Sequence, residues 1–280
     1  MSYGDSISKG KSVAGYVVYE VDKDAKYELH FAPSFYEDIK ENSKKNNDVA
    51  IKVDPSKYED HIDEAKDVMK KYVDAVYLNG ESSGGGTNLS TSDNKAQIVS
   101  LADDKKSSDG DAEFTNDVKA DREEFIKKFV ESFGKGFYNY KPSDAELRTF
   151  AEAYIKANAK RAKIDYKVKA YLPDYAVIYV RPETIDLDNL DVHELSRKFY
   201  EENKGKYSNY SEAMKAGEKY ILENAPSQFE STPLDTSNSM RKEGYEIKMT
   251  KKDGKWTIDT SSKNYDLKDM ARTFRGGIGY

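Results

Sequence analysis

Residues 245–258 read Tyr-Glu-Ile-Lys-Met-Thr-Lys-Lys-Asp-Gly-Lys-Trp-Thr-Ile, and this stretch decides the fold. Apolar side chains alternate on both sides of Asp253-Gly254, which is the spacing of half-buried β-strands. An Asp-Gly pair between two such runs is typical of a type I′ turn, because both turn residues need positive φ. We therefore predict a hairpin that carries Trp256, the only tryptophan of the chain, into the core.

Two more strands are predicted upstream of this hairpin. Ile164, Tyr166 and Val168 alternate with charged residues, so one face of their strand is expected to meet solvent. Residues 175–180 are almost continuously apolar, which predicts a strand that is buried on both faces or central in the sheet. Pro173-Asp174 supplies the turn between the two strands.

The N-terminal region has strand patterns of its own. Residues 17–21 and 27–31 alternate around a turn at Asp22–Ala25, which predicts a hairpin. Residues 49–53 predict a third short strand. Apolar residues then recur at three- and four-residue steps from Ile62 to Val76, and Asp54-Pro55 marks the expected start of this helix.

The remaining helices follow from stripes and caps. Residues 126–134 repeat the character of residues 69–77, with a Lys-Lys-aromatic-Val core, and both segments are predicted to be helical. Ser143 with Glu146 forms a capping box for a helix over 144–160. Three more helices are expected. The first begins at Asp191, the second begins at Asn209 or Ser211 with Met214 in its buried stripe, and the third spans 267–274.

These patterns divide the chain into three parts. Residues 1–54 are rich in predicted strands, and residues 55–117 contain one helix followed by a Gly/Ser-rich and acidic loop. Residues 118–280 contain the helices and strands of one α+β domain. The fold class is therefore α+β, with a curved antiparallel sheet packed on helices and an additional β-rich N-terminal segment.

The Lys252–Asp259 hairpin and the Lys-Lys-aromatic-Val helices resemble the cystatin-like and NTF2-like folds. More narrowly, the chain resembles lipoproteins of low-GC Gram-positive bacteria over roughly 118–274. This resemblance implies an extracytoplasmic location at the cell surface. The lipobox cysteine of such lipoproteins is absent, so membrane attachment is expected only through an N-terminal signal or lipid anchor that has been removed.

Composition excludes several chemistries. The chain has no cysteine, which rules out disulfides, thiolate catalysis and cysteine-ligated metal centres. The net charge is −6 with acids and bases interspersed, which argues against nucleic-acid binding. His30, His61 and His193 lack metal-ligand spacing.

Charged and glycine-rich runs also favour structural roles. The acidic run 103–117 lacks the ligand pattern of a calcium loop and is expected to be solvated. The basic run 156–169 is expected to complement a helix end and a wet strand face. Residues 276–279 are expected to form a flexible tail. No catalytic residue, metal ligand or cofactor is predicted.

We expect a module that binds a protein partner or a small ligand without catalysis. The candidate ligand-binding residues are Tyr166, Tyr171 and Tyr175, in a tyrosine-rich cleft between helices and sheet. The alternatives are an NTF2-like enzyme with a proton-transfer pocket and a structural subunit of an envelope or transfer machine. Homodimer formation stays open.

Overall fold

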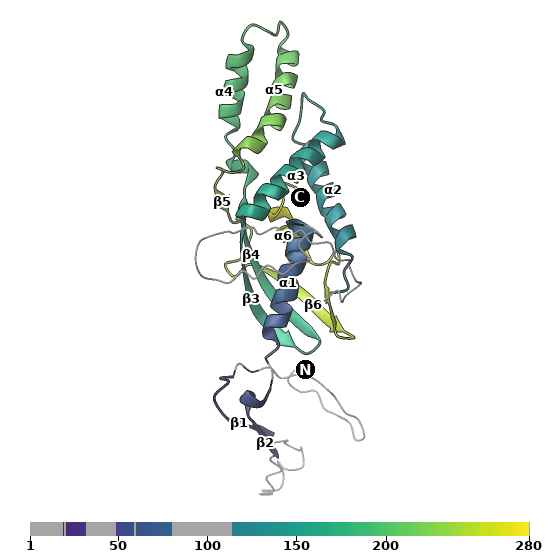
Figure 1. Ribbon diagram of the computed structural model, residues 1–280, viewed down its shortest axis with the longest axis vertical. Coiled ribbons are helices and arrows are strands. Elements are labelled where there is room, and N and C mark those ends of the chain that lie inside the picture. Colours follow the sequence, from purple (N-terminus) through teal and green to yellow (C-terminus); the bar gives the residue numbers. More distant parts are fainter. Residues whose placement is uncertain (1–18, 20, 32–48, 59, 80–113, 280) are drawn as a thin grey trace, which may run out of the picture. The chain divides into compact units, whose positions relative to one another are not determined.

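The computed structural model describes residues 19, 21–31, 49–58, 60–79 and 114–279 (Figure 1). Its contacts divide the chain into two units, Met1–His61 and Ile62–Tyr280. In the described residues the architecture is α+β, with six α-helices, a five-stranded antiparallel sheet and a separate two-stranded sheet. Three short 3-10 helices complete the described elements: η1 (Pro55–Lys57), η3 (Leu187–Asn189) and η4 (Ala225–Gln228).

The N-terminal unit contains the two-stranded sheet. Strand β1 (Tyr27–Phe31) pairs antiparallel with β2 (Val49–Val53). The turn at Asp22–Ala25 is present, with Ala25 N–H donating to the Asp22 carbonyl. The two strands and the turn are confirmed, but β1 does not pair with residues 17–21 among the described positions. Residues 17, 18 and 20 lie outside the described residues.

The sheet of the second unit has the order β3-β4-β6-β7, and β5 pairs with the end of β4. The strands are β3 (Lys163–Leu172), β4 (Tyr175–Ile185), β5 (Leu234–Asp235), β6 (Tyr245–Lys252) and β7 (Lys255–Ile258). The two strands predicted over 164–180 and the hairpin predicted over 245–258 therefore belong to one sheet, as expected. The β3–β4 register shifts between Val168 and Ala170, where β3 contains a bulge.

The two edges of the sheet approach each other on the core side. In the strand order, β4 and β6 separate β3 from β7, which would place the two edge strands about 14 Å apart in a flat sheet. Yet the ring centroids of Tyr171 on β3 and Trp256 on β7 are only 6.1 Å apart. The core-facing side chains of the two edges therefore meet, as a curved sheet allows.

The decisive hairpin forms as predicted. Asp253 and Gly254 have φ of 52° and 79°, and Lys252 pairs with Lys255 across the turn. Trp256 is 1% exposed. Its Nε1 donates to Glu64 Oε1 over 3.0 Å, and Lys251 Nζ donates to the same oxygen. The hairpin is thus attached to α1 (Ile62–Tyr77) by hydrogen bonds as well as by apolar packing.

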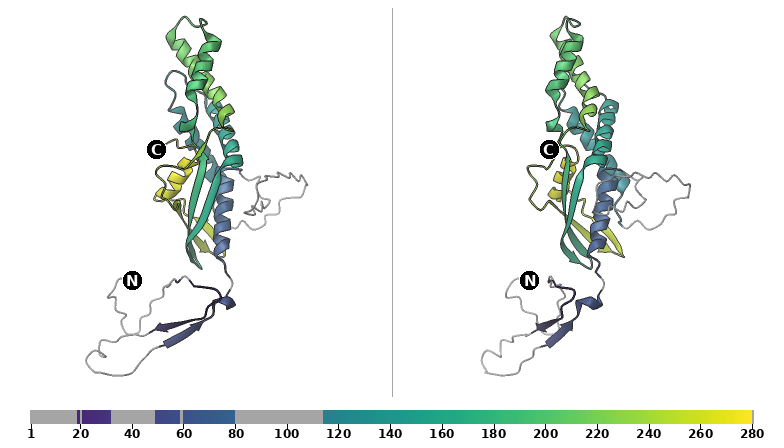
Figure 2. Two further views of the ribbon diagram at one scale, coloured as in Figure 1. Left: turned by 90° about the vertical axis from the view of Figure 1, so that its left-hand side faces the viewer. Right: turned by 60° about the vertical axis from the view of Figure 1, so that its left-hand side comes forward.

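Helix α1 lies along the concave side of the sheet (Figure 2), where it contacts β3, β4 and β7. Its buried stripe includes Met69, Tyr72 and Val76. The predicted start at Asp54-Pro55 was wrong, because Pro55 opens only the 3-10 turn η1. Proline at the first position favours a 3-10 turn as well as an α-helix, so it did not show which of the two begins here.

Helices α2 (Val118–Gly134) and α3 (Asp144–Arg161) pack on each other, and α1 packs on α2. The predicted capping box at Ser143 and Glu146 is present at the start of α3. Arg122 of α2 donates to the backbone carbonyls of Ala75, Val76 and Leu78. The guanidinium therefore satisfies carbonyls that the end of α1 leaves without helical partners.

The C-terminal region is helix α6 (Tyr265–Thr273) and the residues after it. Leu187 N–H donates to the Gly276 carbonyl, and Ile278 packs against the core. A Cβ on Gly276 would lie 2.6 Å from the Leu187 side chain. The expectation of a flexible tail was therefore wrong, because the glycines allow the chain to approach η3 closely.

Candidate functional site

The three tyrosines predicted to bind a ligand do not share one face of the sheet. Tyr171 pairs with Ala176 and Leu172 pairs with Tyr175, so Tyr171 and Tyr175 point to opposite faces. Tyr166 and Tyr171 both pack against the core. Burial, with a smaller contribution from the Asp74 carboxylate, raises the pKa of the Tyr166 hydroxyl. The structure thus places Tyr166 and Tyr171 on the core side of the sheet and Tyr175 on the other side, and their ligand-binding role stays a prediction.

Two of the surface hollows among the described residues lie beside the helices. One, of about 270 Å³, is lined by Glu64, Asp67, Val68, Lys71 and Gly254. The other, of about 390 Å³, lies between α2 and α3 beside Lys127 and Leu147. Glu64 in the first hollow already accepts hydrogen bonds from Lys251 and Trp256. Its carboxylate therefore has a structural role in holding the hairpin.

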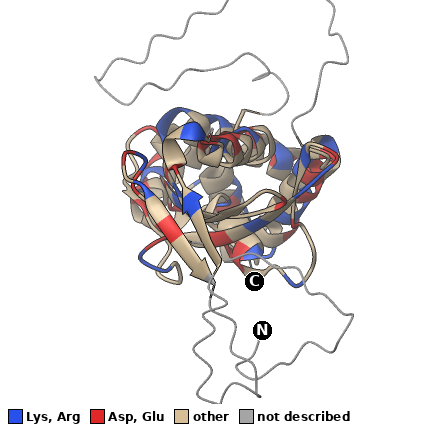
Figure 3. Cartoon of the chain, turned by 90° about the horizontal axis from the view of Figure 1, so that it is seen from below, with Lys and Arg blue, Asp and Glu red and all other residues tan. Residues whose placement is uncertain are grey.

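Three of the charged residues singled out from the sequence pair with carboxylates. His30 Nε2 lies 3.6 Å from the Glu28 carboxylate. Lys160 and Lys169 pair with Glu230 and Glu246, and Figure 3 shows acidic and basic residues interspersed over the described chain. The acidic run 103–113 lies outside the described residues. In the part of the chain that the structure describes, no group of three potential metal-ligating side chains comes together.

The other prominent feature is a helical hairpin formed by α4 (Val192–Asn203) and α5 (Tyr210–Asn224), which extends beyond the end of the sheet (Figures 1 and 2). Each helix begins at a predicted cap. The Asp191 side chain accepts from Glu194 N–H, and the Asn209 side chain accepts from Ser211 N–H. These side chains satisfy first-turn N–H groups, which fixes where each helix starts.

The two helices pack through a small aromatic cluster. The Phe199 ring lies 5.5 Å from the Tyr220 ring and 6.0 Å from the Tyr207 ring. Gly217 faces Phe199, and a Cβ there would lie 3.4 Å from the ring. The glycine therefore allows α4 and α5 to approach closely at this point.

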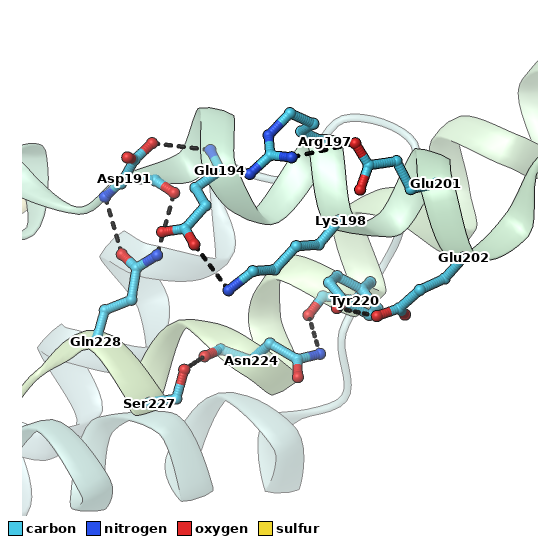
Figure 4. A network of polar contacts seen from close by, with 10 residues as sticks. All are labelled: Asp191, Glu194, Arg197, Lys198, Glu201, Glu202, Tyr220, Asn224, Ser227 and Gln228. Atoms are coloured by element: carbon cyan, nitrogen blue, oxygen red, sulfur yellow. Dashed lines mark hydrogen bonds and ion pairs between the residues drawn. The ribbon is translucent and has the colours of Figure 1, made fainter.

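Polar contacts fix the base of the hairpin (Figure 4). The Gln228 side chain of η4 accepts from Asp191 N–H and donates to the Asp191 carbonyl. Glu194 pairs with Lys198 along α4, and the Tyr220 hydroxyl reaches Glu202 from α5. Gln228 thus ties the start of α4 to the segment that follows α5.

A second attachment lies half-way along α5. The Glu218 carboxylate accepts from Asn139 N–H, Asn139 Nδ2 and Tyr140 N–H at 2.7–2.8 Å. Burial alone would raise its pKa, but these hydrogen bonds outweigh burial and lower it. The loop between α2 and α3 therefore holds the middle of α5 through a charged acceptor.

The loop itself is ordered by a neighbouring carboxylate. The Tyr140 hydroxyl donates to Glu146, the capping-box residue of α3. This bond, together with those from Ser143, lowers the pKa of Glu146 to about 2. Lys219 of α5 lies 5.9 Å above the Tyr140 ring. The loop therefore contacts both α3 and α5.

Exposed apolar side chains gather along this part of the molecule. Tyr210 and Met214 are 80% and 38% exposed and stand one helical turn apart on α5. Glu218 continues the same line, and the loop that it binds carries Tyr138, which is 88% exposed. We call Tyr138, Tyr210 and Met214 the exposed stripe. Large apolar side chains in one exposed group are typical of binding surfaces.

Sequence reasoning missed this surface. The prediction that Met214 is buried was wrong, because its side chain is 38% exposed, on a different side of α5 from the Tyr220 ring that packs on Phe199 of α4. A helical projection of α5 would have shown the Tyr210–Met214–Glu218 spacing. Nothing local could have shown the pairing of Glu218 with Asn139, because 79 residues separate them.

The fold and this surface can now be set beside known proteins. The chain belongs to the family described as "Domain of unknown function (DUF5105)", whose model matches residues 99–275. Among the described residues, no helix is long and apolar enough to span a bilayer.

The chain is a distant homologue of an uncharacterized lipoprotein, YcdA, of Bacillus subtilis strain 168. The two are 24% identical over 287 residues, which cover 97% of this chain and 68% of the relative. The superposition on the crystal structure of the B. subtilis ycdA protein covers 90% of this chain and 68% of the ycdA chain, with a TM-score of 0.55 and 19% sequence identity. This structural likeness shows that the fold is shared.

Proposed function

We propose that this protein is the extracytoplasmic part of a surface lipoprotein that binds a partner protein without catalysis. The lipoprotein relative supports the location, with attachment through an N-terminal anchor. The exposed stripe on the α4–α5 hairpin supports binding, and it is the observation that carries the proposal. The finer assignment to the cystatin-like or NTF2-like folds, which the curved sheet around α1 favours, is part of this proposal.

The stripe suits a protein partner for physical reasons. Tyrosine offers a large rigid contact surface with a polar tip, and methionine adapts its shape to irregular partners. Aromatic anchors contribute much of the binding energy at protein interfaces, commonly about 2 kcal/mol or more each. Two fixed attachments, at Gln228 and Glu218, hold the helices that present these side chains. The surface is therefore preorganised for binding.

Photo-cross-linking in the native host tests this function. A photoreactive phenylalanine analogue replaces Met214 in the full chain, and the matched control carries it at Tyr265 on α6, which is 71% exposed. We expect one discrete protein adduct from position 214 and none of the same mass from position 265. Tyr210→Ala in the first variant should lower the adduct yield about tenfold or more, as expected for an aromatic anchor.

The outcome that contradicts the proposal is equally definite. Adducts of the same mass and yield from both positions, or no adduct from position 214, would show that this surface is not a specific binding site. Far-ultraviolet circular dichroism of the purified variants verifies that each one is folded.

A further inference from the structure

A buried cation of the second unit has no carboxylate partner among the described residues. Arg275, in the segment after α6, is only 7% exposed. Its Nε donates to the Ile278 carbonyl over 3.4 Å, and no other described atom accepts a hydrogen bond from the guanidinium. Buried charges in proteins are ordinarily paired, because an unpaired charge loses its hydration without compensation. The guanidinium is therefore a candidate donor to an anion from outside the chain.

The surroundings of Arg275 offset only part of this charge. The guanidinium carbon lies 6.0 Å from the centre of the Phe125 ring, and the residue follows the C-terminal end of α6, where the helix dipole favours a cation. Burial is the main influence on the pKa of Arg275 and lowers it, while Tyr77 raises it and Arg272 lowers it. Arginine nevertheless stays charged in proteins. The hydrogen-bonding capacity of the two Nη atoms is thus unused within the described residues.

A second donor lies beside the guanidinium. The Ser132 hydroxyl of α2 forms no hydrogen bond within the described residues. A Cβ on Gly279 would lie 2.6 Å from Ser132 Oγ and 3.6 Å from Arg275 Nη2, so the two donors are separated by no more than the sum of these distances. Two hydrogen bonds of about 2.8 Å each to one oxyanion can span such a separation. Because Gly279 has no side chain, the space beside both donors stays open.

The guanidinium can be reached from solvent. In the described residues, every fully enclosed side-chain nitrogen or oxygen has a hydrogen-bond partner. The Nη atoms of Arg275 have no such partner, so they must touch solvent. The small exposed fraction of Arg275 means that only a small group can approach them.

We propose that Arg275, Ser132 and Gly279 form a binding site for a phosphate group, either as free phosphate or at the end of a larger molecule. The guanidinium presents its N–H groups in a planar fork that matches phosphate oxygens. The backbone N–H groups of Ile278 and Gly279 also lack an acceptor within the described residues. Donors from a helix and from a glycine-rich segment suit a tetrahedral phosphate better than a planar carboxylate. The site uses no residue of the exposed stripe, so it is independent of the proposed function.

Titration of the full chain with inorganic phosphate at constant ionic strength tests the site. The signal is the NMR resonance of the Arg275 Nε–H group, which is assigned by its loss in Arg275→Lys. We expect a saturable shift with phosphate and a weaker response to acetate. Gly279→Ala puts a methyl group beside both donors and should weaken phosphate binding about tenfold or more, as expected when a hydrogen bond to a charged group is lost. The matched control, Gly277→Ala, has a similar positive φ of 82° but faces Asp186 at 3.7 Å, so binding should stay unchanged.

Ser132→Ala gives a second test that puts no strain on the backbone, and it should also weaken phosphate binding. Unchanged phosphate affinity in either Gly279→Ala or Ser132→Ala would overturn the site, as would a shift that never saturates. Acetate that binds as tightly as phosphate would overturn the assignment to phosphate. Glycerol 3-phosphate distinguishes the sources: binding equal to that of free phosphate supports the end of a larger molecule, and loss of binding supports free phosphate.

Discussion

Glu218→Gln should release the loop from α5 without unfolding either element. Glu218 accepts three hydrogen bonds from the loop with its two carboxylate oxygens. The glutamine amide has only one oxygen that accepts, and its NH₂ group would face a loop N–H, which is also a donor. Hydrogen bonds to a charged group contribute about 1.5–3 kcal/mol each, but the site is partly exposed, so we expect a net loss of about 2 kcal/mol. That corresponds to about 30-fold in the local opening equilibrium.

Hydrogen exchange measures this opening directly, because Asn139 and Tyr140 donate the bonds that are lost. Their amides should exchange about 30-fold faster in the Glu218→Gln variant at neutral pH. Glu223→Gln removes the same charge one and a half turns further along α5 and should leave both amides unchanged. Equal exchange of the two amides in wild type and Glu218→Gln would refute the reasoning.

The pH dependence of this effect has a definite sign. The hydrogen bonds hold the pKa of Glu218 below its ordinary value despite burial, so the folded pKa lies below the unfolded one. Its stabilising contribution is therefore complete above the unfolded pKa and is lost as the pH falls through the folded pKa. The difference in protection between wild type and Glu218→Gln should accordingly disappear in that acidic range.

Three substitutions and one fluorescence measurement test the fold. Gly244→Ala should lower the free energy of unfolding by more than about 2 kcal/mol in chemical denaturation, because φ is 110° and a Cβ would lie 2.6 Å from a β4 carbonyl oxygen. Gly254→Ala should cost only about 1 kcal/mol, because φ is 79° but a Cβ there would meet open space. Arg122→Ala should cost about 2–3 kcal/mol, measured in the same way, because three carbonyls at the end of α1 lose a charged donor. Trp256 should emit at short wavelength, as a buried indole does, and an emission spectrum of a water-exposed indole would contradict its docking on Glu64.

Local side-chain chemistry allowed much of the fold to be predicted. The capping box at Ser143, the cap at Asp191 and the Asp253-Gly254 turn depend on contacts within a few residues, and all three are present. The start of α1 was wrong because Pro55 fits a 3-10 turn as well as an α-helix. Local chemistry cannot show how far a turn continues when tertiary contacts decide it.

The candidate site depends on contacts that the sequence does not reveal. Tyrosine density drew attention to the β3 and β4 strands, but Tyr166 and Tyr171 pack against the core, and the Tyr171 ring lies beside Trp256. The exposed stripe exists because the packing of Tyr220 on Phe199 leaves Tyr210 and Met214 exposed, and because Glu218 binds a loop far away in the sequence. Both are tertiary choices among faces that have similar local patterns.

Tyrosine footprinting on intact host cells tests the partner surface most directly, because it uses the natural residues. Tyr210 and Tyr265 are similarly exposed in the free chain, at 80% and 71%, so both should be modified readily in the purified protein. On cells, we expect Tyr210 to be protected from modification while Tyr265 stays reactive. Equal modification of Tyr210 on cells and in the purified chain would contradict the claim that a partner covers the α4–α5 hairpin.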